Sequence, residues 1–193
     1  MRLSVGKIGF YGAACVCNLM VWGMFTVLNM PRTDVMAMTD TTQSVRLRHQ
    51  TFIATVGKPT GLAVAALGVS VPVKDGAFNP ETGEWTLSDT SAYFALPSIP
   101  ANDSNGTTII YGHARPGMFE PLTGLGAGMV AEVQTDIGKT FSYEFVGMRE
   151  VDPSDTTVFN DSGAPTLVLQ TCSGPWDAYR ALYTFKYTGM RTT

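Results

Sequence analysis

The sequence is poor in the side chains that most often carry chemistry, with three cysteines and two histidines among 193 residues. Charged residues are also scarce, at 15%, and the net charge is -3 at pH 7. No basic stripe with interleaved aromatic residues is present. Because nucleic-acid binding needs such a surface to neutralise phosphates, this class of function is excluded. No internal repeat or low-complexity tract stands out, so we expect one domain with an appendage.

Charge is missing altogether from residues 8–30, a stretch long enough to span a bilayer. Arg2 and Lys7 precede it, so the positive-inside rule places residues 1–7 in the cytoplasm and the rest of the chain outside. A cleaved signal peptide is the alternative, but the apolar run is long for one and no clear small-x-small cleavage site is present. We expect a single-pass protein of the cell membrane, held by residues 8–30, with an extracellular domain.

The scarcity of cysteine and histidine singles out two residues of that domain. Cys15 and Cys17 lie within the apolar stretch, which leaves Cys172 without an intramolecular disulfide partner outside the membrane. Such a cysteine is an intermolecular link or a reactive thiol, or else a small apolar residue at a strand end. His49 falls in residues 31–58, which we expect to be a solvated stalk. His113 is therefore the one imidazole of the domain at residues 59–193.

Long helical patterns are absent from the domain, and short strand patterns replace them. Apolar or alternating runs occupy residues 62–73, 85–87, 91–96, 107–111, 129–135, 140–146, 166–172 and 181–187. The turn at 136–139 predicts a hairpin, and one helical turn is expected near Val158. We interpret residues 62–73 as one strand that continues by alternation. Short strands at close spacing indicate an all-β closed barrel or a sandwich.

Three residues stand at the ends of these strands. Cys172 ends the run 166–172, His113 follows the run 107–111, and Arg180 precedes the last run. A thiol nucleophile needs a partner that promotes the thiolate, a leaving amine needs a proton donor, and an oxyanion needs positive charge. Cysteine, histidine and arginine supply these roles, so the sequence predicts a catalytic site. A surface position for Arg180 is the simpler alternative.

The pattern around these residues resembles the sortases, membrane-anchored cysteine transpeptidases of mainly Gram-positive bacteria. The resemblance spans about residues 60–187, and the short connections are most similar to the class E/F group. The residues that carry it are Ile110-Tyr111-Gly112-His113, then Phe119 and Leu122, then Leu167-Val168-Leu169-Gln170-Thr171-Cys172, and finally Tyr179-Arg180.

This resemblance implies a closed eight-stranded β-barrel with short helices, preceded by one transmembrane helix. Cys172 would cleave the Thr-Gly bond of a Leu-Pro-x-Thr-Gly-like sorting signal on surface proteins, forming a thioester. An amine of a peptidoglycan precursor or of a pilin subunit would then resolve the thioester. His113 would act as general acid and base, and Arg180 would stabilise the oxyanion. No cofactor or metal is implied.

The resemblance also implies substrate-binding residues. Thr171 would shape the oxyanion site, and Tyr111 and Phe119 are candidate groove residues, with strand and core packing as their alternatives. We also expect Trp176 to be a packing residue. No Asp-Pro-aromatic motif precedes the barrel, which favours anchoring over pilus polymerisation. The acidic residues of the region are expected to form a solvated edge rather than a calcium site: Glu144, Glu150, Asp152 and Asp155.

Two other functions remain open from the sequence. A thiol peptidase would use the same three residues and pass the acyl group to water. A non-enzymatic surface β-domain would instead use Cys172 in an intermolecular disulfide.

Overall fold

The computed structural model describes residues 53–160 and 162–193. The predicted cytoplasmic segment 1–7, the anchor 8–30 and most of the stalk 31–58 lie outside these residues. Within the two ranges, none of the helices is long and apolar enough to cross a bilayer. The last residues assigned to the stalk include a two-residue strand, β1 (Val56–Gly57), which pairs with β7 (Ala101–Asn102).

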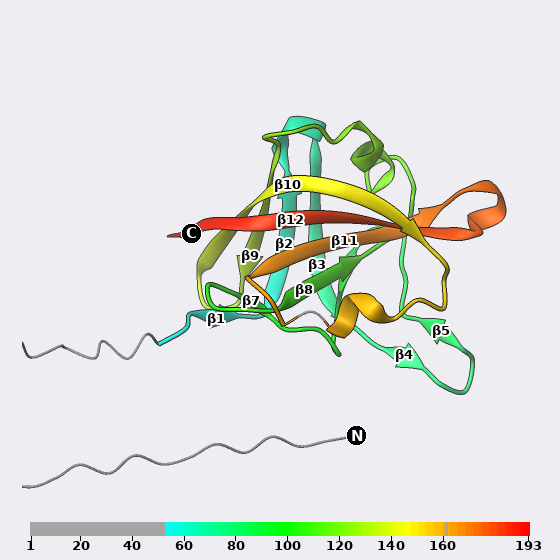
Figure 1. Ribbon diagram of the computed structural model, residues 1–193, viewed down its shortest axis with the longest axis horizontal. Helices are drawn as coiled ribbons and strands as arrows, with labels where there is room; N and C mark the ends of the chain where they lie inside the picture. The colour runs from blue at the N-terminus through cyan, green and yellow to red at the C-terminus, as the bar shows by residue number, and fades with distance from the viewer. Residues whose placement is uncertain (1–52, 161) are drawn as a thin grey trace, which may run out of the picture. The chain divides into compact units, whose positions relative to one another are not determined.

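The described chain forms a closed, eight-stranded barrel, as the resemblance implied (Figure 1). Neighbouring strands follow the order β10-β12-β11-β8-β6-β3-β2-β9, and β9 closes the barrel on β10. The barrel strands are β2 (Pro59–Val64), β3 (Val69–Gly76), β6 (Ala92–Ala95), β8 (Thr107–Tyr111), β9 (Val130–Thr135), β10 (Lys139–Val151), β11 (Thr166–Ser173) and β12 (Tyr179–Thr192).

Most expected strands are confirmed, including the hairpin β9–β10 and the run that ends at Cys172. The interpretation of residues 62–73 as one strand is wrong. The chain turns back through a 3-10 helix, η1 (Ala65–Leu67), and β2 and β3 pair antiparallel. Gly68 permits this turn because its φ of 67° lies in the left-handed region. Alternation then resumes in β3, where Val69, Val71 and Val73 are buried.

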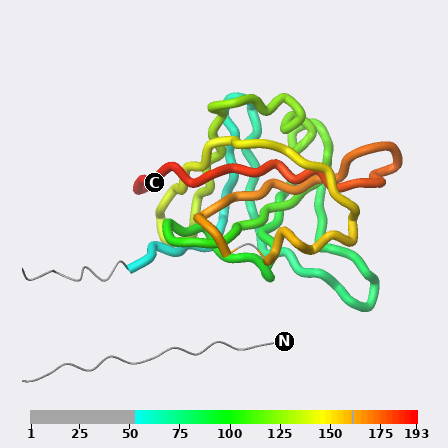
Figure 2. The backbone as a smooth tube through the Cα atoms, in the orientation of Figure 1, coloured from blue at the N-terminus to red at the C-terminus, as the bar shows by residue number. Residues whose placement is uncertain are grey.

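Short elements lie in the connections between the barrel strands. The hairpin of β4 (Phe78–Asn79) and β5 (Glu84–Trp85) is inserted between β3 and β6. Three further 3-10 helices are η2 (Glu120–Gly124), η3 (Thr157–Asn160) and η4 (Pro175–Asp177). The tube in Figure 2 shows the β11–β12 turn and the β4–β5 hairpin at the end of the barrel away from the C-terminus. The expected helical turn near Val158 is η3.

Strand β8 is buried on both faces, because one face lies in the barrel core and the other is covered from outside. Ile110 points into the barrel core with Phe141, Leu169 and Phe185, whereas Ile109 belongs to a second cluster. Successive side chains of a strand point to opposite faces, so the second cluster lies on the outer face of the sheet. It is covered by residues of β5 and η3 and comprises Tyr93, Ala95, Ile109, Tyr111, Val158, Val168 and Leu182, with Trp85, Val151 and Phe159 packed against it.

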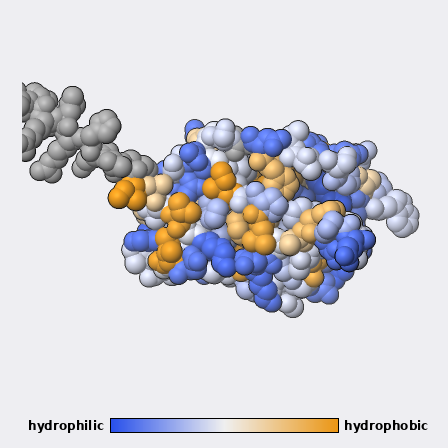
Figure 3. Space-filling model, turned by 90° about the horizontal axis from the view of Figure 1, so that it is seen from below, coloured by the Kyte–Doolittle hydropathy of each residue, from blue (hydrophilic) through white to orange (hydrophobic). Residues whose placement is uncertain are grey.

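Apolar side chains also reach the surface. Seen from below, apolar groups are scattered among hydrophilic ones (Figure 3). The interior clusters, rather than this surface, hold the barrel together, since each fully buried Leu, Ile or Phe side chain contributes about 1.5–3 kcal/mol.

Candidate active site

Two parallel neighbours, β8 and β11, deliver His113 and Cys172 to the same edge of the barrel. The register pairs Gln170 with Tyr111, and the Gly112 amide donates to the Gln170 carbonyl at 3.1 Å. The buried Thr171 hydroxyl donates to the Gly112 carbonyl at 2.7 Å. These hydrogen bonds hold the segment after β8 against β11 beyond the last paired residues of the two strands. Extending the register by two residues therefore puts Cys172 level with His113.

Arg180 joins this edge from the next strand. It is the register partner of Cys172 in the antiparallel pair of β11 and β12. Its Nη1 donates to the carbonyls of Asp177 and Tyr179, both at 2.9 Å. A guanidinium carries five N–H donors, so the side chain is oriented by the turn while other donors stay available. All three predicted catalytic residues thus stand at one end of the sheet.

A cavity of about 530 Å³ opens beside Cys172 on the outer face of the sheet. Its floor consists of strand residues, and its walls come from the β4–β5 hairpin and from the β10–β11 connection. The lining residues are Gly83, Glu84, Trp85, Leu87, Ala95, Ile109, Tyr111, Gly112, Pro153, Asp155, Thr156, Phe159, Gln170, Thr171, Cys172 and Arg180. His113 does not line it.

The thiol of Cys172 is half-buried and free of any disulfide. Burial raises its pKa, the positive charge of Arg180 acts in the opposite direction, and the Asp177 carboxylate adds to the rise. The raised pKa means that the neutral thiol dominates at neutral pH. If this thiol acted as a nucleophile, it would have to lose its proton during the reaction, which requires a nearby base.

The imidazole of His113 lies near the carboxylate of Asp89. Its Nε2 lies 3.9 Å from Oδ1 of Asp89, and the same oxygen forms an ion pair with Nη1 of Arg115. Only 27% of the His113 side chain is exposed.

Comparison with known proteins identifies this arrangement. Residues 62–187 match the family model of the sortase domain. The chain belongs to the sortase family. Sortases are cysteine transpeptidases, and the enzyme class expected from the site is thereby confirmed. A search of curated proteins finds no match.

Solved sortase structures share the fold at low sequence identity. Sortase E1 from Streptomyces coelicolor is 20% identical, with a TM-score of 0.59 over 70% of this chain and 91% of that one. Sortase A from Listeria monocytogenes is 17% identical, with a TM-score of 0.57 over 70% and 90%. Sortase C-1 from Actinomyces oris is 19% identical, with a TM-score of 0.56 over 67% and 72%. Because classes A, C and E all match, the class E/F assignment stays a prediction.

An aromatic wall of this sortase's cavity was missed by the sequence analysis. Trp85 contacts Tyr111 edge-on at 5.2 Å between ring centroids, and it stacks on Phe159 at 6.2 Å with an interplanar angle of 3°. Phe78 also packs against Trp85, with ring centroids 5.7 Å apart. The hairpin, the floor and η3 are thus joined through one indole. The turn-rich sequence around Trp85 gave no signal for these long-range contacts.

Tyr111 is a floor residue of the cavity. Its hydroxyl is buried and has no hydrogen-bond partner. Burial, and then the neighbouring Tyr93, raises the pKa of Tyr111 above its usual value. The phenol is therefore neutral at physiological pH and can donate a hydrogen bond. A buried polar group without a partner is costly, and this hydroxyl lies against Gly76 of β3.

Two aromatic residues lie elsewhere than expected. Phe119 is fully buried in the barrel core, where its ring faces Gly112. The prediction of Phe119 as a groove residue is therefore wrong, and the alternative of core packing holds. A ring enclosed by the core cannot contact a substrate. Trp176 was expected to pack, but its side chain is 99% exposed. Its φ of 59° is shared by Asp177, and two adjacent left-handed residues turn the indole away from the barrel.

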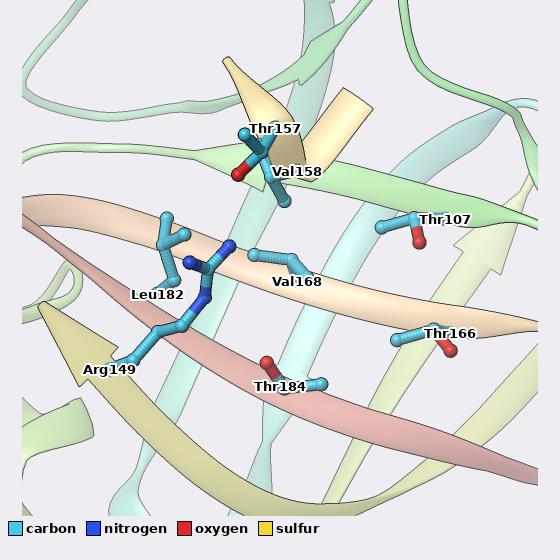
Figure 4. A pocket seen from close by; sticks show the side chains of 8 residues that line it. All are labelled: Thr107, Arg149, Thr157, Val158, Thr166, Val168, Leu182 and Thr184. Carbon is cyan, nitrogen blue, oxygen red and sulfur yellow. The ribbon is translucent and has the colours of Figure 1, made fainter. Parts of the chain in front are cut away.

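A second hollow lies on the same outer face (Figure 4). Its volume is about 180 Å³, and its lining includes Arg149 and several threonines but none of the predicted site residues. Thr157 and Val158 line it, whereas Thr156 and Phe159 line the larger cavity. The segment around η3 therefore separates the two.

The acidic residues near η3 are exposed or half-exposed. Hydrogen bonds from Ser154 lower the pKa of Asp152, and those from Thr157 lower the pKa of Asp155. Both carboxylates therefore stay ionised at neutral pH. Across residues 53–160 and 162–193, no group of three or more His, Cys, Asp and Glu side chains is placed to hold a metal ion.

Proposed function

We propose that this sortase cleaves a Leu-Pro-x-Thr-Gly-like sorting signal and transfers the acyl group to an amine. The observation that carries the proposal is that Cys172 and Arg180 are register partners that both line the large cavity. Extension of the β8–β11 register by two residues puts His113 level with Cys172. Family membership supplies the reaction class. The geometry supports the assignment of roles to individual residues.

The first step is attack of the Cys172 sulfur on the Thr-Gly carbonyl. The thiol proton passes to His113, and negative charge develops on the carbonyl oxygen. The Arg180 guanidinium, oriented by two carbonyls, is placed to stabilise that charge. The Thr171 hydroxyl is committed to the Gly112 carbonyl, so Thr171 contributes by holding His113 beside Cys172 and not through a hydroxyl hydrogen bond to the oxyanion.

The second step is collapse of the tetrahedral intermediate. The imidazolium of His113 gives its proton to the leaving glycine amine, the C–N bond breaks, and a thioester remains on Cys172. An incoming amine then attacks this thioester. His113 accepts the proton of that amine, and the thiol regains its own when the new amide bond forms.

The lining of the cavity favours a sorting signal that has an apolar side chain near the N-terminal end of the signal. Its walls and floor include Trp85, Phe159, Ile109 and Ala95, which favour an aliphatic group such as leucine. Tyr111 supplies one polar group within this apolar surface. An amine of a peptidoglycan precursor or of a pilin subunit completes the reaction as the acceptor.

We further propose that residues 8–30 anchor the enzyme as a single-pass protein with its barrel outside the cell. The charge-free stretch and the preceding Arg2 and Lys7 support this topology. Membrane attachment would keep the enzyme near substrates that are themselves membrane-bound before sorting.

The test uses purified full-length chain with Leu-Pro-x-Thr-Gly and Leu-Ala-x-Thr-Gly peptides, with and without triglycine as the amine acceptor. Mass spectrometry follows the products, and Cys172→Ala is the control. An amine-dependent product that Cys172→Ala abolishes is expected. Product formed only with water would assign the activity to a thiol peptidase. Peptides left intact by the wild-type chain would overturn the proposed substrate class.

A further inference from the structure

A carboxylate from a separate segment reaches the imidazole of the proposed site. Asp89 lies in the connection between β5 and β6, and its Oδ1 is 3.9 Å from Nε2 of His113. This separation exceeds a hydrogen bond, so the interaction is electrostatic. The Asp89 side chain is 67% exposed.

A cation shares the same carboxylate oxygen. Arg115 forms an ion pair with Asp89 through Nη1. The loop that carries Arg115 folds tightly on His113, because the amides of Arg115 and Phe119 both donate to the His113 carbonyl, at 3.0 and 3.1 Å. Asp89 is therefore placed between a permanent positive charge and an imidazole whose charge changes during the reaction.

We propose that Asp89 is a positioning residue for His113, and this inference rests on the proposed function. Asp89 balances the charge of Arg115 and places a negative charge on the Nε2 side of the imidazole. Without the carboxylate, the Arg115 guanidinium would oppose formation of the imidazolium. Transfer of a proton to the leaving amine requires that imidazolium, so the balance between Asp89 and Arg115 sets how readily His113 acts as an acid.

The charges around His113 come from three directions. Asp89 belongs to the β5–β6 connection, and Arg115 belongs to the loop of His113 itself. Cys172 stands at the end of β11, with Arg180 of β12 opposite it. Asp177, in the turn between those strands, acts on the thiol. Substitutions at Asp89 and Arg115 leave the Cys172–Arg180 pair unchanged, so they test the imidazole separately from the thiol.

The first readout is NMR titration of the His113 imidazole in the full-length chain. His49→Gln removes the other histidine signal, and Cys172→Ala removes titration of the thiol. Asp89→Asn removes an anion beside the imidazole, so the titration midpoint should fall by roughly 0.2–0.7 pH units. Arg115→Gln removes a cation and should move the midpoint upward. Asp89→Glu keeps the charge and should hold the midpoint near that of the parent.

The second readout is the pH profile of kcat/KM in chains that retain Cys172. Asp89→Asn should move the acidic limb to lower pH and reduce the plateau by ~2–5-fold, with KM unchanged. Asp89→Glu should restore the plateau. A purely structural role would lower the plateau without moving the limb. Far-ultraviolet circular dichroism confirms folding, which exposed substitutions are expected to preserve.

Equal titration midpoints for the parent and Asp89→Asn would overturn the inference, as would shifts of the same sign for Asp89→Asn and Arg115→Gln. The NMR measurement does not depend on turnover. Suppose that Asp89→Asn and Arg115→Gln shift the His113 midpoint in opposite directions, but the chain processes no peptide. The inferred charge balance around His113 would then stand, and the proposed function would be contradicted.

Discussion

Cys172 and Arg180 are direct neighbours across the antiparallel pair of β11 and β12. Directly opposite residues place their side chains on the same face of a sheet, and both line the large cavity. The turn between them is only a few residues long, so its conformation fixes the distance from thiol to guanidinium. This relationship ties the reactivity of the thiol to the local charges.

Alkylation of Cys172 should report these charges. Burial raises the pKa of the thiol, Arg180 opposes the rise, and Asp177 reinforces it. Less thiolate is therefore present at a given pH than in an unburied thiol, and the iodoacetamide rate should reach half its maximum at a higher pH. Arg180→Gln should move this midpoint further up, and Asp177→Asn should move it down. Shifts of equal sign in the two variants would contradict the assignment.

Thr171→Val should disturb the link between the two strand ends. The valine has nearly the same shape but cannot donate to the buried Gly112 carbonyl, so unfolding should become easier by about 1–3 kcal/mol. The looser His113 loop should lower kcat/KM by at least ~10-fold. Thr166→Val is the matched control, because its hydroxyl bonds to Ala164 at an exposed position. Urea unfolding and peptide kinetics measure both effects, and equal losses in the two variants would refute the role of Thr171.

Tyr111→Phe should separate stability from substrate binding. Removing a buried hydroxyl without a partner should raise the free energy of unfolding by about 1 kcal/mol. If that hydroxyl donates to the substrate, KM should rise roughly 3–10-fold while kcat changes little. Chemical denaturation and steady-state kinetics provide the two numbers. A variant that is more stable and has an unchanged KM would remove Tyr111 from the binding surface.

Gly174→Ala should damage the turn that joins Cys172 to Arg180. Gly174 has φ 74° and ψ 174°, a region that favours glycine, and an added Cβ would lie 2.7 Å from Cδ2 of Tyr179. The strain should cost about 1–3 kcal/mol and lower kcat. Gly128→Ala is the control, since its φ is 80° but nothing lies within 4 Å of its Cβ. Both should lower the melting temperature, and loss of turnover in both alike would contradict a local effect.

The sequence predicted the chemistry of the site better than its surroundings. Cys172 and His113 could be singled out as candidates because each comes after a strongly apolar strand, beside a glycine-containing turn. Asp89 and Trp85 could not be found, since both belong to a polar, turn-rich stretch whose partners lie far away in the chain. The break at Gly68 was hidden within an unbroken apolar run. Trp176 was misplaced because composition does not report that two successive residues adopt left-handed backbone angles.

The most direct test of the proposed chemistry is the intact mass of the full-length chain, quenched in acid after brief mixing with a sorting-signal peptide. The proposal predicts a mass increase equal to the acyl fragment, mapped to Cys172, absent in Cys172→Ala and formed more slowly in Arg180→Ala. Peptide cleavage without any adduct on the wild-type chain, or an adduct that persists in Cys172→Ala, would contradict it.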